Sequence, residues 1–289
     1  MTKPKTIRLV MPQWQGGNNP LYHLGAELLE FLAPHTNVPS FTVPVTKPDM
    51  PLENENGIVG RKEVVKQLQS AYAIINSEKP DKIVMFGGDC LVDLAPFSYL
   101  GTVYGKSFGI LWIDAHPDVM TPEQFANSHA HVLGALMGNG DPDLVKDVKT
   151  PVPVERVMIA GIHHPTDYEK QFLQDHEIST VSPEQLKTSD QPVLDWIKKQ
   201  NIEYLAIHLD LDVLDFHLFH ALLMAEPGVS ADKYAGIAEG RLTMDDVIKL
   251  VNDVNEATTI VGIGIAEHLP WDALHLKNML AGLPLVNGN

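Results

Sequence analysis

The chain alternates short apolar runs of β-forming residues with segments whose apolar residues recur at helical spacing. One such run, Lys82 to Phe86, is stopped by Gly87 and Gly88. Strands that alternate with helices pair in parallel, and parallel strands are buried on both faces. The alternation therefore predicts an α/β fold with a mainly parallel sheet. The predicted strands are Ile7–Met11, Phe41–Val45, Lys82–Phe86, Phe108–Ile113, Arg156–Ile162, Glu203–Leu209 and Thr258–Ala266.

Helices are predicted between these strands from apolar spacing and from end signals. Leu21 to Leu32 is one helix, and Leu274 to Leu283 closes the chain as another. Ser182, followed by Pro183 and Gln185, is typical of a capping box at the start of a further helix. Thr243 and Asp246 form the same signal, and Val64, Leu68 and Ile75 mark one more apolar helical face.

The 289 residues suffice for one large α/β domain or two modest ones. No repeat, low-complexity tract or Gly/Ser linker divides them, so a single domain over 1–289 is the expectation. The formal charge of −16 argues against nucleic-acid and anionic-membrane partners. Cys90 is the single cysteine, which excludes an internal disulfide, and no apolar run approaches a membrane span. A cytoplasmic location is the expectation.

Polar residues follow five of the predicted strands directly. Ligands of open parallel sheets bind beyond the carboxyl ends of the strands, so these residues should converge on one site. They are Asp89 and Cys90, then Asp114, His116 and Asp118, then His163 and His164, then Asp210 and Asp212, and finally Glu267 and His268.

Two of these clusters have the spacing of metal ligands. Asp114, His116 and Asp118 alternate, so their side chains leave a strand end in the same direction, and Asp210 and Asp212 repeat the pattern. Four carboxylates and one imidazole suit a divalent ion such as Mn²⁺, and a carboxylate can bridge two metals. The alternative is that these are Asp-rich surface turns or N-caps of the following helices.

The motifs around these residues resemble those of the ureohydrolase superfamily, which contains arginase, agmatinase and formiminoglutamase. Phe86 to Cys90 is similar to the GGDH signature, Trp112 to Asp118 matches DAHxD, and His208 to Asp215 matches DxDxxD. Gly240 to Thr243 and Ala266 to Pro270 are weaker echoes in the expected order. The similarity spans roughly Pro80 to Trp271.

The resemblance implies a single three-layer α/β/α domain and a homo-oligomer, trimeric or hexameric. It also implies a hydrolase acting on C–N bonds of linear amidines, with two Mn²⁺ ions per chain bridged by a hydroxide that attacks the guanidinium carbon. Asp114 and Asp210 would bridge the metals, and His116 and Asp212 would complete one site. Asp118 would serve the other site, in which Cys90 stands where the family has a histidine.

Two further roles follow from the resemblance. Glu267 would hold the cationic guanidinium or amidinium of a small substrate, because a carboxylate binds a planar cation through charge-assisted hydrogen bonds. A histidine would protonate the leaving amine. His129 matches the family's proton shuttle when the following helix is aligned, whereas an ungapped count selects His131.

Three departures from the family pattern bear on the metal and the substrate. A Cys90 thiolate would prefer a softer ion than Mn²⁺ or leave a weak site, and the alternative is a small buried apolar residue. Met120 and Thr166 stand where arginases have groups that bind the amino-acid end of L-arginine. Phe216 to Lys233 replaces a family motif with an unrelated, partly apolar stretch.

Two other functions are compatible with the same residues. A mononuclear-zinc deacetylase-like amidohydrolase would use Asp114, His116 and Asp210, but the tandem histidines that such enzymes carry upstream are absent here. A catalytically impaired relic of the family would keep the fold for a structural or regulatory role. Cys90 and the altered stretch favour a relic, while retention of the Asp and His ligands argues against it.

Overall fold

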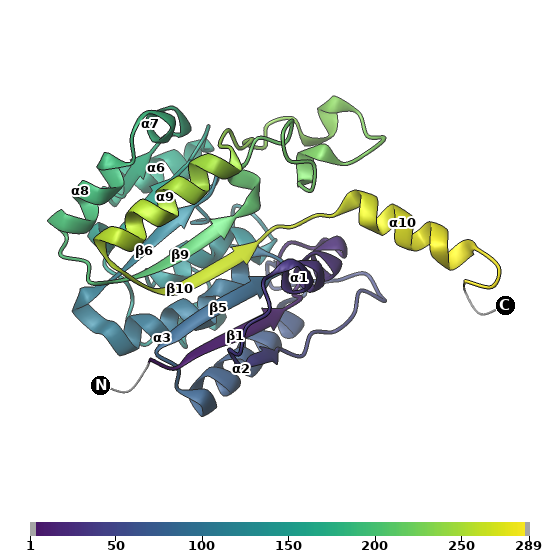
Figure 1. Ribbon diagram of the computed structural model, residues 1–289, viewed down its shortest axis with the longest axis horizontal. Coiled ribbons are helices and arrows are strands. Elements are labelled where there is room, and N and C mark those ends of the chain that lie inside the picture. Colours follow the sequence, from purple (N-terminus) through teal and green to yellow (C-terminus); the bar gives the residue numbers. More distant parts are fainter. Residues whose placement is uncertain (1–3, 287–289) are drawn as a thin grey trace.

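A computed structural model describes residues 4–286, and a single eight-stranded parallel sheet forms its centre (Figure 1). The strand order is β2-β1-β5-β10-β9-β6-β7-β8, and every neighbouring pair is parallel. This confirms the predicted parallel α/β class. The strands are β1 (Thr6–Met11), β2 (Ser40–Thr42), β5 (Lys82–Gly87), β6 (Phe108–Ile113), β7 (Val157–Ala160), β8 (Ser179–Val181), β9 (Tyr204–Asp210) and β10 (Thr259–Ala266).

Helices cover both faces of the sheet, giving the three layers that were expected (Figure 1). On one face α2 and α3 pack over the first core, and on the other α8 and α9 pack over the second. The helices are α1 (Leu21–Leu32), α2 (Arg61–Glu78), α3 (Leu94–Tyr104), α4 (Val132–Leu136), α5 (Pro142–Val145), α6 (Asp167–Asp175), α7 (Pro183–Thr188), α8 (Gln191–Lys199), α9 (Met244–Ala257) and α10 (Trp271–Gly282).

Strand β6 shows why a continuous apolar run is needed at the centre of such a sheet. All six of its residues are buried, and they alternate between the two cores. Ile110 and Trp112 belong to the first core, whereas Leu111 and Ile113 belong to the second. Because both faces are covered, no position on this strand can be polar without losing its hydration.

The helix starts predicted from capping boxes are confirmed, whereas the strands at the edges of the sheet were predicted poorly. The capping boxes of Ser182 with Gln185 and of Thr243 with Asp246 are both present. The strand predicted at Phe41–Val45 is shorter, because it pairs only at the sheet edge and Pro44 has no N–H to donate. Strand β8 and the hairpin of β3 (Asn54–Glu55) with β4 (Ile58–Val59) were not predicted, since such short polar segments carry no clear period.

Two segments extend from the body of the sheet: α10 and the segment from 216 to 240, which holds no α-helix or strand (Figure 1). None of the residues of α10 is buried. Within residues 4–286, no helix combines the length and apolar character needed to cross a membrane.

Candidate metal centre and active site

The predicted site residues, apart from His129 in the 3₁₀ turn Ser128–His131, lie at or beyond the carboxyl ends of four adjacent strands, β5, β10, β9 and β6. Three of these ends share one turn, in which an aspartate accepts a hydrogen bond from the N–H two residues later. The N–H groups of Leu91, His116 and Asp212 donate in these turns, over 3.1, 2.6 and 2.6 Å. The acceptors are Asp89, Asp114 and Asp210, so each strand stops and presents its next side chain at the same edge.

These strand ends form the floor of a cavity of about 410 Å³. Asp114 lies beneath the floor and is fully buried. The other proposed ligands and both proposed catalytic residues line the cavity, namely Cys90, His116, Asp118, His129, Asp210, Asp212 and Glu267. The structure thus brings together residues that the sequence spreads over 178 positions, from Cys90 to Glu267 (267 − 90 + 1).

One group of potential metal ligands consists of Asp114, His116 and Asp212, whose ligand atoms all lie within 4.8 Å of one another. His116 Nδ1 is 3.1 Å from Asp212 Oδ2 and 3.4 Å from Asp114 Oδ1. A second group consists of Cys90, Asp114, Asp210 and His208. Asp114 belongs to both groups, whereas Asp210 belongs to the second group alone.

Cys90 points into the second group. Its Sγ is 3.1 Å from Asp210 Oδ2 and 3.6 Å from Glu267 Oε1, and the side chain is buried. Burial, followed by the charge of Asp210, raises the pKa of the thiol well above its ordinary value. Asp118, which was paired with Cys90 from the family pattern, lines the same cavity but lies outside both groups.

The floor is electrostatically costly without a cation. Burial and then the charge of Asp212 raise the pKa of Asp210 well above its ordinary value. Burial and then the charge of Asp114 do the same to Asp118. Carboxylates that cannot all ionise together are destabilised by desolvation and mutual repulsion, and a divalent cation relieves both effects.

Buried atoms without hydrogen bonds point to the same conclusion. Such atoms are rare in folded proteins and call for an explanation. Within the described part of the chain, several of them surround the cavity floor, namely His116 Nε2, Asp118 Oδ2, Asp212 Oδ1, His129 Nδ1 and His208 Nε2. The residues present therefore fit divalent cations, both in their donor types and in the atoms that lack other partners.

Glu267 follows β10 and stands at the centre of a small polar cluster in the cavity. The Tyr22 hydroxyl donates a hydrogen bond to Glu267 Oε2, and His129 Nδ1 is 3.9 Å from Oε1. Burial and then the charges of Asp212 and other carboxylates raise the pKa of Glu267, although the Tyr22 hydrogen bond opposes this shift. The cluster places an acid group and an imidazole side by side above the metal-ligand groups.

The two histidines that alignment left open have different surroundings. His129 lines the cavity, and burial followed by nearby His116 lowers its pKa to about 3. His131 is fully buried outside the cavity, with Nε2 2.8 Å from the carbonyl oxygen of Phe125. Of the two histidines, His129 is therefore the one that lines the cavity.

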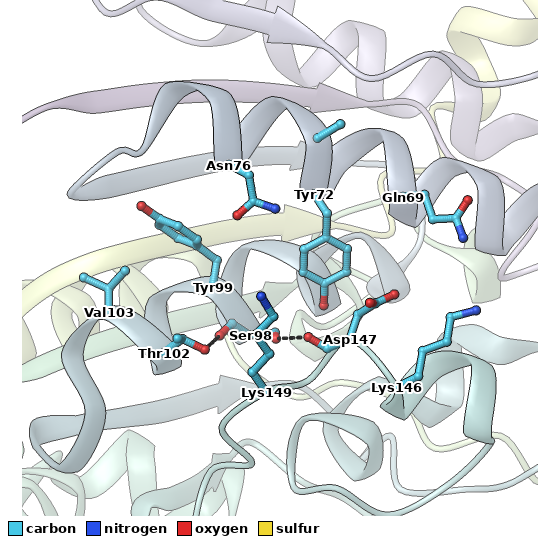
Figure 2. Close-up of a pocket in the computed structure, with 11 residues that line it drawn as sticks. Gln69, Tyr72, Asn76, Ser98, Tyr99, Thr102, Val103, Lys146, Asp147 and Lys149 are labelled. Carbon is cyan, nitrogen blue, oxygen red and sulfur yellow. Dashed lines mark hydrogen bonds between the residues drawn. The ribbon is translucent and has the colours of Figure 1, made fainter.

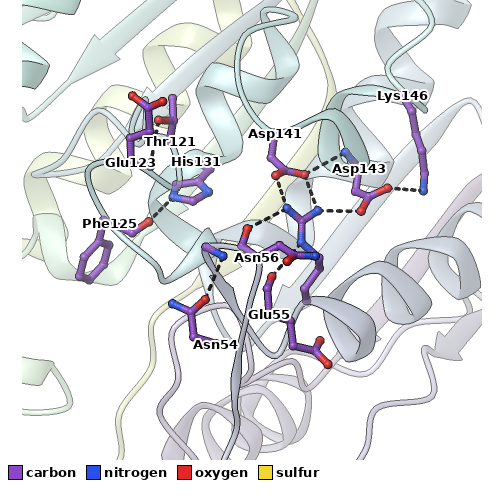
Figure 3. A network of polar contacts seen from close by, with 12 residues as sticks. Asn54, Glu55, Asn56, Thr121, Glu123, Phe125, His131, Asp141, Asp143 and Lys146 are labelled. Carbon is purple, nitrogen blue, oxygen red and sulfur yellow. Dashed lines mark hydrogen bonds and ion pairs between the residues drawn. The ribbon is translucent and has the colours of Figure 1, made fainter.

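A polar network braces the segment that contains Phe125 and His131 (Figure 3). His129 lies on the same segment, which forms part of the cavity wall. Arg61 at the start of α2 donates to both carboxylate oxygens of Asp141, and to Asp143 over 2.7 Å. It also donates to the carbonyl of Glu55 in the β3–β4 hairpin over 3.0 Å. From the end of that hairpin, the N–H of Val59 donates to the carbonyl of residue 126 over 2.9 Å, tying the wall segment to the body.

The weak sequence echo at Gly240 to Thr243 has a structural reason. A Cβ at Gly240 would lie 2.0 Å from the carbonyl oxygen of Asp212, so only glycine allows this approach. The N–H of Leu242 then donates to the carbonyl of Val213 over 3.0 Å. The segment thereby supports the turn that carries Asp212.

A second cavity, of about 480 Å³, lies between α2 and α3, away from the strand ends (Figure 2). Tyr72, Ser98 and Lys146 line it, and burial raises the pKa of Tyr72 to about 12. Ser98 donates a hydrogen bond to the carbonyl of Asp147 over 3.3 Å. None of the predicted site residues lines this cavity, so the smaller one is the candidate active site.

Sequence reasoning missed Tyr22, Asp93 and His208. His208 had a usable signal, since it precedes Asp210 by two positions on one strand and must face the same side. Tyr22 occupies an apolar helix position and Asp93 a short 3₁₀ turn, so neither had a signal in the sequence.

A parallel sheet with a carboxylate-rich group of potential metal ligands at its strand ends makes this an α/β protein with a candidate metal centre. The sequence model of the Arginase family matches residues 33–278, so this chain belongs to that family. Arginase from Staphylococcus aureus strain MRSA252 is 25% identical over 173 residues, 56% of each chain. Arginase from Entamoeba histolytica is 27% identical over 198 residues, 64% of each. The matches thus span less than two thirds of these relatives.

Solved structures show the same fold. Entamoeba histolytica arginase in complex with L-ornithine superposes with a TM-score of 0.77 at 21% identity, over 93% of this chain and 92% of that one. Arginase from Bacillus caldovelox gives 0.74 at 20% identity, over 98% and 100%. Formimidoylglutamase from Bacillus subtilis gives 0.65 at 15% identity, over 93% and 81%.

Proposed function

We propose that this chain is a metal-dependent hydrolase that cleaves a C–N bond of a small guanidino or amidine compound. Family membership and the metal-ligand cluster support this. The observation that carries it is that Glu267 and His129 line one cavity together with His116 and Asp212, above the buried Asp114. A buried carboxylate beside metal ligands suits a substrate that is itself a planar cation.

Each residue has a proposed role. Asp114 and Asp210 would hold two cations jointly, with His116 and Asp212 at one and Cys90 at the other, and Asp118 close by. When bound, such a pair, Mn²⁺ in the family, activates water for attack on the guanidinium carbon. Glu267 orients the substrate cation through charge-assisted hydrogen bonds.

The reaction is balanced by water alone. An oxygen–carbon bond forms, the bond from that carbon to the substituted nitrogen breaks, and urea and an alkylammonium ion leave. His129, which is neutral because burial lowers its pKa to about 3, would relay a proton released by the attacking water to the departing nitrogen, which would otherwise leave as an unstable amide anion. Tyr22 holds Glu267 in place through its hydrogen bond.

The upper wall of the cavity favours a substrate with an uncharged tail. Apolar side chains form much of this wall: Met120, Phe125, Leu223, Met224 and Ile237. Among the described residues that line the cavity, none is Lys or Arg, so a substrate carboxylate would find no fixed positive charge. Burying that unpaired charge would cost more than the contacts return.

Polar side chains on the same wall already contact other residues of the protein. Glu169 Oε2 accepts hydrogen bonds from the N–H and hydroxyl of Thr166, over 2.7 and 2.8 Å, in the capping box of α6. His164 also lines the wall, next to the ring of His163 at 3.9 Å. Unlike Lys or Arg, an imidazole does not supply a permanent positive charge.

The test is hydrolysis of a matched series by metal-loaded protein at about pH 8.5. n-Butylguanidine, agmatine, γ-guanidinobutyrate and L-arginine share a guanidinium and an alkyl spacer and differ in tail charge. We expect kcat/KM for butylguanidine to exceed the others by about tenfold or more. Absence of hydrolysis throughout would refute the proposed function, whereas a preference for a charged tail would refute only the tail assignment.

A substitution in the wall sharpens the same test. Met120→Lys places a cation beside the tail, so γ-guanidinobutyrate should gain about tenfold in kcat/KM while butylguanidine loses a similar factor. Met120→Leu is the matched control, because it keeps the apolar surface without a charge. Equal behaviour of the two variants would show that this residue does not contact the tail.

Association of several copies is also proposed. Leu276, Met279 and Leu280 of α10 are 52, 54 and 40% exposed, on a helix that extends from the body (Figure 1). Apolar side chains on an extended helix are typical of a surface that packs against another copy. Sedimentation equilibrium should show an oligomer, and replacing these three residues with serine should yield monomers.

A further inference from the structure

His208 is a buried imidazole in the metal-ligand cluster, and the resemblance to the family gave it no role. It lies on β9 two residues before Asp210 and has no exposed surface. Its ring stacks on Trp112 of the neighbouring strand β6, with ring centres 3.6 Å apart and planes 11° apart. Burial and stacking against Trp112 therefore leave the imidazole ring little freedom to rotate.

A buried carboxylate sets the direction of this ring. Asp93, in the 3₁₀ turn after β5, is 2.7 Å from His208 Nδ1. Asp93 lies against Gly264 on β10, where a Cβ would be 1.9 Å from the carboxylate oxygen, so glycine is required there. Since a carboxylate accepts, Nδ1 carries the proton and Nε2 has a free lone pair.

That lone pair has no hydrogen-bond partner within the described chain. Nε2 is 3.8 Å from Asp114 Oδ2, too far for a hydrogen bond. Ligand atoms of Cys90, Asp114, His208 and Asp210 all lie within 4.8 Å of one another, and all four residues are buried. An oriented imidazole with an unused lone pair and three further donors is the arrangement of a metal ligand.

We propose that His208 binds metal and that, together with Cys90, Asp114 and Asp210, it forms a site for Zn²⁺ or a similarly soft cation. This inference rests on the metal dependence proposed above and adds a ligand and a metal preference to it. His208 supplies from β9 the imidazole that is missing at Cys90 after β5. Asp93 is a positioning residue that orients the ring.

The donor types separate the two sites. One sulfur, one nitrogen and two carboxylate oxygens form a set of the kind that Zn²⁺ binds in proteins. The group around His116 and Asp212 has one imidazole and carboxylates, which suit Mn²⁺. The chain should therefore bind two different metals, one in each of the two ligand groups that have Asp114 in common.

The experiment measures metal binding in protein stripped with a chelator, without substrate. Zn²⁺, Mn²⁺ and Co²⁺ are titrated separately, and bound metal is counted by mass spectrometry of the dialysed protein. We expect one tight Zn²⁺ per chain and a second equivalent that Mn²⁺ fills. Co²⁺ in the Cys90 site should give a sulfur-to-metal absorption band that Cys90→Ala abolishes.

Variants at His208 and Asp93 test the new ligand itself. His208→Asn keeps a donor toward Asp93 but removes Nε2, so Zn²⁺ affinity should fall by about 100-fold or more while Mn²⁺ binding persists. Asp93→Asn should weaken Zn²⁺ binding by about 10- to 100-fold. His176→Asn is the control, since His176 also stacks on an aromatic ring, Phe172 at 4.1 Å, but lies outside the cluster.

Several outcomes would overturn this inference. They are two Mn²⁺ sites of equal affinity in the wild type, no sulfur band with Co²⁺, or unchanged Zn²⁺ affinity in His208→Asn. If that variant fails to fold, Asp93→Asn and the Co²⁺ spectrum decide instead. Because binding is measured without turnover, Zn²⁺ at this site with no guanidine hydrolysis would refute the proposed function alone.

Discussion

The floor of the cavity and the segment from 216 to 240 differ in how they are built. The floor lies at the ends of four paired strands, and its residues are mostly buried. The segment has only short 3₁₀ turns and carries exposed apolar residues, of which Leu218 is 69% and Ile237 41% exposed. Backbone hydrogen bonds tie it to the body at few places, one being the Leu269 N–H to the Ala221 carbonyl at 2.9 Å.

This difference suggests that the floor carries out the metal chemistry and that the segment from 216 to 240 selects the substrate. Metal chemistry needs donors held within a fraction of an ångström, which paired strands supply. Substrate selection needs a surface that can vary without disturbing the strands, which a loop supplies. We expect changes in the floor to alter metal binding and kcat, and changes in the segment to alter KM.

The largest effect is expected at Asp210 in the floor. Asp210→Asn removes a proposed metal ligand, so metal content should fall and kcat/KM should drop by about a thousandfold. The metal-free variant should be more stable than metal-free wild type by about 1 kcal/mol, because one of several repelling buried carboxylates is gone. Metal analysis, kinetics and urea unfolding measure these effects. Equal metal content in variant and wild type would contradict the assignment.

Glu267 should affect the substrate without affecting the metals. Glu267→Gln keeps the shape and the hydrogen bond with Tyr22 but removes the charge that attracts a guanidinium. KM should rise about 10- to 100-fold, as expected for a charge-assisted hydrogen bond. Metal content should stay at the wild-type value, and loss of metal would assign this residue to the ligands instead.

The brace at Arg61 links stability to the position of His129. Arg61→Ala leaves Asp141, which is 6% exposed, without its partner, so unfolding free energy should fall by about 2 kcal/mol. Because the wall segment loosens, kcat should fall severalfold at unchanged metal content. Chemical denaturation measures the first effect. Lys62→Ala is the control, since Lys62 pairs with Glu55 at the exposed surface and should leave stability unchanged.

The smallest effect is expected in the loop segment. Leu223→Ser removes apolar surface from the cavity wall, so KM for butylguanidine should rise about fivefold with kcat and metal content unchanged. Leu218→Ser is the matched control, because Leu218 belongs to the same segment but does not line the cavity. If both variants change KM equally, the effect comes from the loop as a whole and not from contact with the tail.

The sequence by itself determined the parallel α/β class, the central strands and most of the candidate floor. Asp114, His116 and Asp212 could be found because ligands at strand ends follow a fixed period after an apolar run. Strand β8 and the β3–β4 hairpin could not, since short polar segments acquire their conformation from neighbours that pair with them. The resemblance favoured His129 as the proton shuttle but left His131 as the alternative.

Only the tertiary structure decided which residues share the floor with these motifs. Tyr22 from α1 meets Glu267 from the end of β10 across 245 positions of sequence, and Asp93 meets His208 across 115. Sheet order sets such contacts, because β10 inserts between β5 and β9 late in the chain. A helical tyrosine and a turn aspartate acquire a role only when β10 and β9 place Glu267 and His208 beside them.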